Sequence, residues 1–220
     1  MLADLFTPTL TDARHRVSRI HPRNYASTRN FLDGAVTMLS PYITHGFVEV
    51  AEIAASVAEN HRPEDCEKLL MEFGWREFFQ HVWRHAGDGI LRDMRPGLAG
   101  VRYADALPDD IREARTGIPV IDHAVRTLYQ TGYLHNHARM WVASYVVHLR
   151  KVSWRAGADW MMAYLLDGDP ASNHLSWQWV AGTFSHKPYL FNAENVARYA
   201  MPGAPHWASE GSSLDVSYEA

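Results

Sequence analysis

Apolar residues recur at helical spacing along most of this chain, and the alternation typical of half-buried strands is weak. The spacing predicts helices over residues 47–60, 63–85, 119–131, 136–151, 155–166 and 171–182. Ser40 and Pro41 predict a further helix start, because serine caps helices and proline suits the first helical position. Glycine and proline interrupt residues 86–110, so we expect a long irregular connection there. The sequence therefore predicts one all-α domain over residues 1–220.

The composition narrows the class of protein. Of the 220 residues, 47% are hydrophobic and 21% are charged, which is typical of a globular domain and excludes disordered and collagen-like chains. No apolar run approaches the roughly 18 residues of a membrane span, and the N-terminus does not resemble a signal peptide. A single cysteine, Cys66, excludes an internal disulfide and a four-cysteine zinc or iron–sulfur site within the chain. We therefore expect a soluble cytoplasmic protein without membrane contact.

The charge distribution allows two interpretations. The net charge is −4, which argues against generic electrostatic binding to nucleic acid. Residues 14–29 nevertheless contain five arginines and no acidic residue. This run is either a local phosphate-binding surface or a solvated helix face and loop, which is the commoner meaning of a charge run. The eight tryptophans, taken alone, are most simply core residues of a helical domain.

Two short motifs lack part of the context that their chemistry needs. Gly87-Asp88-Gly89 has no third glycine and follows no strand, so it is not a dinucleotide-binding fingerprint. His81 and His85 have the spacing of zinc ligands on one helix, but the glutamate of the metalloprotease motif is absent. We therefore expect no metal site.

Polar groups inside apolar helices are the strongest indication of a binding site. They are Glu72, Arg76, Glu77, Asn136, Arg139, Asp167, Asp169 and Asn173. Buried charges are costly unless they are paired, so one interpretation is ion pairs between helices, such as Arg76 or Arg139 with Asp167. The other is a polar ligand held between helices, with helix starts aimed at its phosphates. Composition alone leaves both open.

Five motifs in a fixed order carry a family resemblance. They are Met71-Glu72-Phe73-Gly74-Trp75-Arg76-Glu77-Phe78-Phe79, Thr116-Gly117-Ile118-Pro119-Val120-Ile121-Asp122, Thr131-Gly132-Tyr133-Leu134-His135-Asn136-His137-Ala138-Arg139-Met140, Leu166-Asp167-Gly168-Asp169-Pro170-Ala171-Ser172-Asn173 and Trp177-Gln178-Trp179. Over roughly residues 25–192 the chain resembles the FAD-binding domain of the DNA photolyase/cryptochrome family, and residues 193–220 form a divergent tail. The resemblance implies an all-α fold that holds a U-shaped FAD between helices. Because the chain starts with Met1, we expect a short form without the family's antenna domain and antenna chromophore.

The resemblance also implies a set of cofactor contacts. Arg139 and Asp167 resemble the family's ion pair beside the flavin ring, and Asp169 would accept from the ring's imide edge. Asn173 resembles the residue that faces flavin N5, where an amide is typical of the repair enzymes. The implied FAD-binding residues are Tyr25, Thr37, Leu39 and Ser40 at or near the phosphates, with Arg76, Asn136, Arg139, Asp167, Asp169 and Asn173.

The implied activity is light-driven repair of UV-damaged DNA. Excited reduced FAD passes one electron to a cyclobutane pyrimidine dimer, the ring splits, and the electron returns. The lesion would be flipped out of the helix and met by aromatic platforms. The implied substrate contacts are Glu72, which would hydrogen-bond the dimer, and Trp75, Asn136, His137, Met140 and Trp179. Trp177 and Trp154 match the inner two members of the electron-transfer chain that photoreduces FAD.

Departures from the family pattern keep alternatives open. The family's electron-transfer chain has a third, outermost tryptophan that this sequence lacks. Val101 lies near its position, and Tyr103 is an alternative electron donor. Met38 replaces an arginine of the family's phosphate site, and His137 replaces an arginine that meets the lesion in the family's dimer-repair enzymes. The alternatives to an antenna-less photolyase are a blue-light or redox flavoprotein without repair activity and a binding module that has lost the flavin. Lesion preference, preference for single- or double-stranded DNA, and oligomeric state also stay open.

Overall fold

The computed structural model describes residues 5–200, 207, 209 and 212–215. Within these residues the secondary structure is helical, and the β-type pairing is limited to an isolated bridge between Ala104 and Val152, so the all-α prediction is confirmed. The helices are α2 (Leu10–Ser18), α3 (Pro22–Thr28), α4 (Ser40–Thr44), α5 (Val50–Asn60), α6 (Pro63–Ala86), η1 (Gly87–Leu91), α7 (Asp109–Arg112), α8 (Pro119–Thr131), α9 (Asn136–Ser144), η2 (Tyr145–Leu149), α10 (Trp154–Tyr164), α11 (Pro170–Ala181) and α12 (Ala193–Tyr199).

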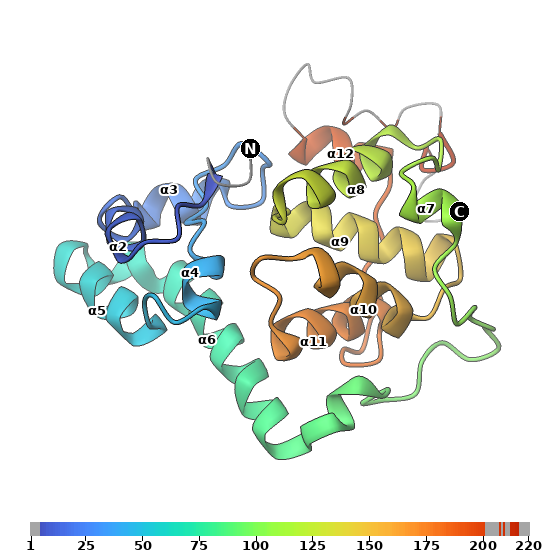
Figure 1. Ribbon diagram of the computed structural model, residues 1–220, viewed down its shortest axis with the longest axis horizontal. Helices are drawn as coiled ribbons and strands as arrows, with labels where there is room; N and C mark the ends of the chain where they lie inside the picture. Colours follow the sequence, from blue (N-terminus) through green and yellow to red (C-terminus); the bar gives the residue numbers. More distant parts are fainter. Residues whose placement is uncertain (1–4, 201–206, 208, 210–211, 216–220) are drawn as a thin grey trace.

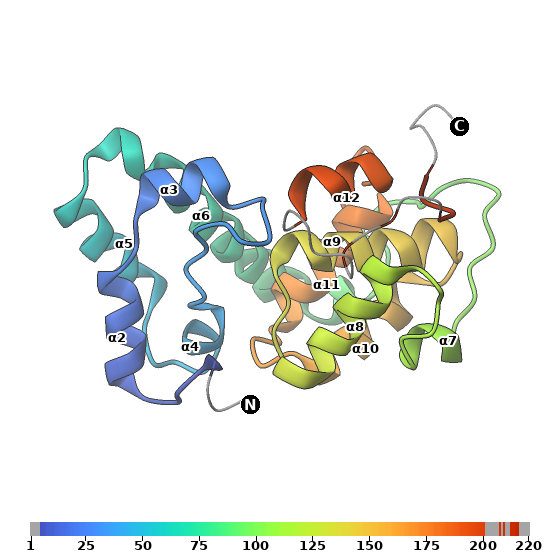
Figure 2. The ribbon, with the colours of Figure 1, turned by 90° about the horizontal axis from the view of Figure 1, so that it is seen from above.

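The helices form two lobes that α6 connects. Figure 1 shows α2 to α5 on one side and α8 to α12 on the other, with α6 running from the first group along the second. Figure 2 shows the same separation from above. We call the two groups the N-terminal lobe and the C-terminal lobe. Each has its own hydrophobic cluster: among the described residues, ten buried ones between Phe6 and Leu69 form the first and thirty between Leu107 and Leu214 form the second.

Helix α6 begins and ends much as the sequence predicts. Pro63 lies in its first turn with acidic residues, and basic residues lie in its last turn, which matches the helix dipole. Gly87 follows the helix with a φ of 52°, a conformation that glycine adopts without strain. Cys66 and Leu69 are the buried residues of this 24-residue helix. Most of its side chains are therefore half-buried or exposed, including those at the junction of the lobes.

Glycine and proline also set the ends of the C-terminal helices. Pro119 opens α8, and Gly132 ends it in the left-handed region with a φ of 62°, as predicted. Gly182 ends α11 in the same way, with a φ of 82°. The predicted cap of α4 is wrong by one residue, because Leu39 occupies the cap position and Ser40 is the first residue of the helix.

Two predictions of helical extent are corrected. The helix predicted over 136–151 stops being regular at Ser144 and continues as a π-helical turn, Tyr145–Leu149. In that wide turn the Arg150 N–H bonds the Tyr145 carbonyl at 3.0 Å, which apolar spacing does not reveal. Helices α2, α3 and α12 were not predicted, because helices of seven to nine residues show few periodic repeats.

Two structural findings concern membranes and metals. No helix within the described ranges is long and apolar enough to cross a membrane. The same residues contain no group of three or more His, Cys, Asp or Glu side chains placed to hold a metal ion. His81 and His85 lie on α6 with ring centroids 4.2 Å apart.

Candidate functional site

An ion pair between a half-buried arginine and a buried aspartate lies where the two lobes meet. Arg139 of α9 donates through Nη2 to both carboxylate oxygens of Asp167, at 3.0 and 2.8 Å, and the Asp167 side chain is 3% exposed. Arg139 Nε donates to the Leu134 carbonyl at 2.7 Å, which fixes the guanidinium. From the N-terminal lobe, Thr44 donates to the Asp167 carbonyl at 3.4 Å. The pair thus connects α9 to the turn between α10 and α11 beside α4.

A second carboxylate stands at the start of α11. Asp169 accepts from the Ser172 N–H at 2.9 Å, as the cap of the helix, and from Gln80 Nε2 of α6 at 2.7 Å. Arg76 Nη1 lies 3.9 Å from Asp169 Oδ2, and its Nη2 donates to Thr44 Oγ1 at 3.3 Å. Of the two expected pairs, Arg139 with Asp167 is found, whereas Arg76 lies beside Asp169 instead of Asp167.

Asn173 connects α11 to α10. It is buried, and its Nδ2 donates to the Ala158 carbonyl at 2.9 Å. The neighbouring Ser172 Oγ is buried and has no hydrogen-bond partner among the residues that the structure describes. A buried polar atom without a partner is costly, so this hydroxyl favours a polar ligand or water beside the first turn of α11.

Trp177 is buried at the contact between α10 and α11. A Cβ added at Gly157 would lie 2.3 Å from Trp177 Cζ3, far inside van der Waals contact. Only glycine at 157 therefore lets the Trp177 ring lie against the α10 backbone.

Trp154 lies one helical turn before Gly157 on α10, so the structure brings the two tryptophans predicted for electron transfer to one interface. Trp154 is 6% exposed, and its indole Nε1 donates to Asp93 Oδ1 at 2.6 Å. Tyr103, the alternative outer member, packs half-buried against the same core cluster. Burial, with a smaller effect of Asp93, raises the pKa of the Tyr103 phenol.

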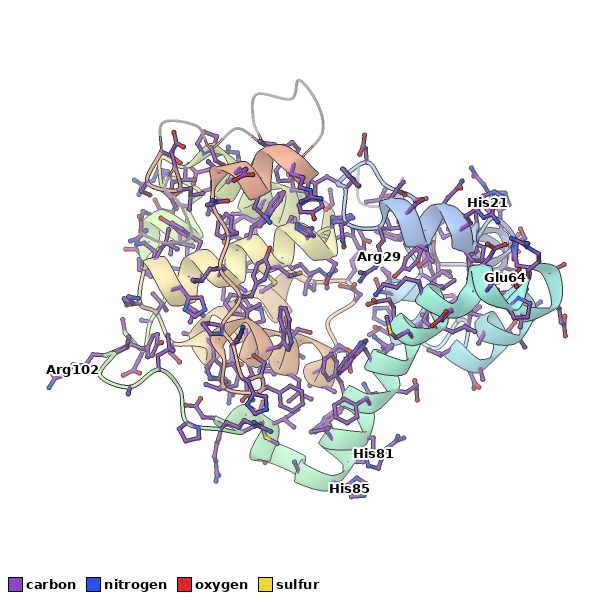
Figure 3. The ribbon with its side chains drawn as sticks, turned by 180° about the vertical axis from the view of Figure 1, so that it is seen from behind. His21, Arg29, Glu64, His81, His85 and Arg102 are labelled. Carbon is purple, nitrogen blue, oxygen red and sulfur yellow. The ribbon has the colours of Figure 1, made fainter. Side chains whose placement is uncertain are left out.

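Glu72 has both carboxylate oxygens engaged by cations. Arg29 Nη2 lies 2.8 Å from one oxygen, and Lys68 Nζ lies 2.9 Å from the other. The Arg29 guanidinium also lies over the Tyr25 ring, 5.8 Å from its centroid. Figure 3 shows Arg29 at the end of α3 that faces the other lobe and His21 at the opposite end. Arg29 thus connects α3 to the junction through Glu72.

Besides Glu72, four of the predicted substrate contacts are at least partly accessible. Trp75 of α6 and Trp179 of α11 are 49% and 41% exposed, although indoles are usually mostly buried. Trp179 stacks on Tyr189 with ring centroids 5.9 Å apart. Asn136 is exposed at the start of α9 and donates to the half-buried Met140 Sδ at 3.6 Å. These side chains are open to a flat, partly apolar ligand.

His137 does not share that accessibility, contrary to the prediction that it meets the substrate. Its side chain is buried, with ring centroids 5.2 Å from Trp141 and 4.4 Å from Tyr199. Burial lowers the pKa of His137 to about 4, so the ring is neutral at pH 7. The aromatic surroundings hold the ring inside the C-terminal lobe.

A pocket of about 240 Å³ opens in the N-terminal lobe. Two predicted phosphate contacts, Tyr25 and Thr37, line it together with Arg16, Arg19 and His21. Arg16 is paired with an acid of its own helix at 2.9 Å, whereas no hydrogen bond or ion pair of the Arg19 side chain is found within the described ranges. Two cationic groups and a hydroxyl in one pocket favour an anionic ligand.

The other predicted phosphate contacts lie beside this pocket rather than in it. Leu39 is fully buried, and its N–H donates to Thr37 Oγ1 at 3.4 Å. Met38, at the position of the family's arginine, lines the pocket with a φ of 51°. Sequence reasoning missed Arg19 and His21 as pocket residues, although the run of arginines without acids was the signal for them.

Comparison with known proteins identifies the fold. The sequence profile described as "FAD binding domain of DNA photolyase" matches residues 69–202, which is more than half of the chain. The chain belongs to the photolyase/cryptochrome family. A deoxyribodipyrimidine photo-lyase of Agrobacterium fabrum is 30% identical over 88% of this chain and 42% of its own length. The rice protein named Cryptochrome DASH, chloroplastic/mitochondrial, is 31% identical over 72% of this chain and 28% of its own length.

Solved structures of the photolyase/cryptochrome family agree with this assignment. A bacterial class III photolyase from Agrobacterium tumefaciens superposes with a TM-score of 0.80 at 27% identity, over 94% of this chain and 45% of its own. A Synechocystis cryptochrome gives 0.77 at 25% identity, over 88% and 44%. The chain spans less than half the length of these relatives. Because proteins named photolyase and proteins named cryptochrome both match, family membership alone does not select between repair and other uses of the fold.

Proposed function

We propose that this chain binds FAD and splits cyclobutane pyrimidine dimers in UV-damaged DNA under light. The observation that carries the proposal is the exposure of two indoles, Trp75 and Trp179, together with the accessible side chains of Asn136 and Met140 on α9. Flat, accessible side chains of this kind bind flipped bases by stacking. The chain covers less than half the length of these relatives, and we propose that this span is sufficient for repair.

The residues present fit FAD in their chemistry. The N-terminal pocket offers Arg16, Arg19 and Thr37 to a diphosphate. We propose that Arg19 supplies the positive charge of the family arginine that Met38 replaces. At the junction, the paired carboxylates and arginines, with the unpartnered Ser172 hydroxyl, suit a ring system rich in donors and acceptors. The proposed contacts are Tyr25, Thr37, Leu39, Ser40, Arg76, Asn136, Arg139, Asp167, Asp169 and Asn173.

Bound reduced FAD supplies the light absorption and the one-electron chemistry of the reaction. The chain's own residues supply position and charge. Arg139 neutralises Asp167 and so makes the junction tolerant of a ligand that carries negative charge. Glu72 is held by Arg29 and Lys68, so its carboxylate is oriented to accept a hydrogen bond from a pyrimidine N–H.

Trp177 and Trp154 are assigned to photoreduction rather than to repair. Both indoles are buried at the α10–α11 interface, so their rings are shielded from water during electron transfer. The Trp177→Phe variant is therefore expected to slow light-driven reduction of FAD and to spare repair by chemically reduced protein. Loss of both in that variant would contradict the assignment.

The deciding experiment is repair of an oligonucleotide that holds one cyclobutane thymine dimer. Dark-purified, chemically reduced protein is illuminated with blue light beside a dark control, and FAD occupancy is recorded on the same sample. Trp75→Ala is expected to abolish most repair, whereas Leu10→Ala, at an exposed apolar residue of α2, is the matched control.

A non-repair flavoprotein is the second candidate, and the buried His137 favours it, because the family's lesion-facing arginine has no accessible equivalent there. Full FAD occupancy with dimers left intact under light would establish that candidate. Repair only in the light would exclude it.

A further inference from the structure

The indole of Trp154 is tied to a carboxylate. Its Nε1 donates to Asp93 Oδ1 at 2.6 Å, at the short end of the range for a hydrogen bond to an ionised acceptor. Trp154 itself is 6% exposed, whereas Asp93 lies on an exposed stretch of the connection after η1. The carboxylate thus stands between a buried indole N–H and water.

Other buried or half-buried indoles have different partners. Trp141 donates to the amide oxygen of Asn195 at 2.9 Å, and Trp160 donates to the Tyr129 hydroxyl at 2.9 Å. An amide oxygen and the oxygen of a neutral phenol are both very weak bases, so neither takes up a proton readily. A carboxylate takes up a proton readily. It can therefore accept the indole proton when the indole loses an electron.

The surroundings keep this arrangement in place. The segment that carries Tyr103 is fixed to the start of α10 by two backbone hydrogen bonds of 2.8 Å, from the Ala104 N–H to the Lys151 carbonyl and from the Ser153 N–H to the Ala104 carbonyl. On the other side, the His174 ring meets the Trp154 ring edge-on at 6.4 Å and bonds Asp159 at 2.8 Å. Trp154 therefore has fixed neighbours, of which Asp93 receives its N–H.

We propose that Asp93 is the proton acceptor for oxidised Trp154. The inference rests on the electron-transfer role given to Trp154 under the proposed function. When Trp154 gives one electron to oxidised Trp177, the indole N–H bond breaks and its proton forms an O–H bond on Asp93. Trp177 is restored, Trp154 becomes a neutral radical, and Asp93 becomes a neutral acid that exchanges its proton with water.

The step has a direct consequence for charge separation. An indole radical cation is a far stronger acid than indole, so a carboxylate already hydrogen-bonded to it takes the proton without any rearrangement. Return of the electron then requires return of the proton as well, which prolongs the separated state. Proton loss at Trp154 thus slows charge recombination, which a third, outermost tryptophan would otherwise do by moving the radical farther from the flavin.

The test is transient absorption of FAD-loaded protein in the oxidised state, which distinguishes a neutral tryptophan radical from a radical cation by spectrum. Wild-type protein is expected to show the neutral radical, formed more slowly in D2O than in H2O. Asp93→Asn keeps an oxygen acceptor but cannot take a proton, so its radical is expected to stay a cation and to decay faster. Asp93→Glu is expected to restore the neutral radical, and Asp88→Asn, an exposed carboxylate change on η1, is the matched control.

Apoprotein provides a second arm that does not need the flavin. A photogenerated ruthenium(III) polypyridyl ion oxidises the tryptophans, and the difference between the Asp93→Asn and Asp88→Asn records isolates the contribution of Trp154. A cation component in that difference supports the proposal even if no FAD binds, in which case the proposed function fails alone. Identical records from the two variants, or a wild-type radical indifferent to D2O, would overturn the role of Asp93. If the role of Asp93 is overturned but the same samples hold stoichiometric FAD, the proposed function is not affected.

Discussion

The two lobes differ in how they are held together. In the part of the chain that the structure describes, the C-terminal lobe packs thirty buried apolar residues around α8 to α11, whereas the N-terminal lobe packs ten around α2 to α6. Contacts across the junction are polar in part, as in Thr44 with Asp167, and apolar in part, as in the Phe6 and Tyr133 rings, whose centroids lie 5.2 Å apart. Because apolar burial is the main source of stability, the C-terminal lobe is the stable unit and the N-terminal lobe depends more on the junction.

The sharpest test of this comparison uses one leucine from each cluster. Leu128 and Leu69 are both 1% exposed, the first in the larger cluster and the second in the smaller. Leu128→Ala is expected to cost about 4 kcal/mol and Leu69→Ala about 2.5 kcal/mol, because a smaller core collapses more easily around a cavity. Urea denaturation gives both values.

Hydrogen exchange then shows where protection is lost. Leu69→Ala is expected to expose the amides of α3 and α5 while those of α9 and α11 stay protected. Equal loss of protection in both lobes would remove the distinction between them.

The pair of Arg139 and Asp167 at the junction is the next test. Asp167→Asn leaves the Arg139 guanidinium without its carboxylate and is expected to cost about 3 kcal/mol. Asp109→Asn removes an exposed partner of Arg112 and is expected to cost less than about 0.5 kcal/mol. The two free energies of unfolding are compared at one pH and salt concentration. A cost for Asp167→Asn as small as that of the control would show that the pair does not stabilise the junction.

Gly157→Ala tests packing within the C-terminal lobe. The added Cβ overlaps the Trp177 ring, so we expect a loss of about 2 kcal/mol and a changed near-UV signal from the displaced indole. Gly74→Ala is the control, because nothing lies within 4 Å of its added Cβ and alanine favours a helix by about 1 kcal/mol. Stabilisation by both substitutions would mean that the α10–α11 contact is looser than described.

Acid sensitivity tests two histidines at the start of α9. Burial lowers the pKa of His135 and His137 from 6.5 to about 4. As the pH falls from 6.5 toward 4, the unfolded chain takes up protons that the folded chain does not. The free energy of unfolding is therefore largest above pH 6.5 and falls below it, by up to roughly 1.4 kcal/mol per pH unit for each histidine.

His137→Gln is expected to flatten this slope, measured as the urea midpoint between pH 4 and 7. Ser144→Ala removes a buried hydrogen bond to the Tyr189 carbonyl without removing a titrating group, so it should lower the whole curve and keep its slope. An unchanged slope in His137→Gln would show that this histidine takes up its proton in the folded protein as in the unfolded chain.

Much of the fold was predictable because its signals are local. Pro63, Pro119, Gly132 and Gly182 mark helix ends through their own backbone preferences, and the long apolar patterns follow from periodicity. The π-helical turn after Ser144 has no signal in the apolar spacing, and the seven-residue helix α12 is too short to show a periodic pattern.

The site was predictable in part for the same reason. The ion pair of Arg139 and Asp167 follows from charges inside apolar helices that must find partners. The inward ring of His137 and the Arg19 pocket require knowledge of which side of each element faces the core. That information arises only when the lobes are packed.

The closeness of Gly157 and Trp177 limits how this sequence can change over time. Any larger residue at 157 requires a smaller ring at 177, so the two positions can exchange volume but cannot vary independently. A lineage that accepts alanine at 157 is driven toward losing the indole. If Trp177 carries the electron transfer proposed above, a methyl group on the opposite helix would be enough to begin its loss.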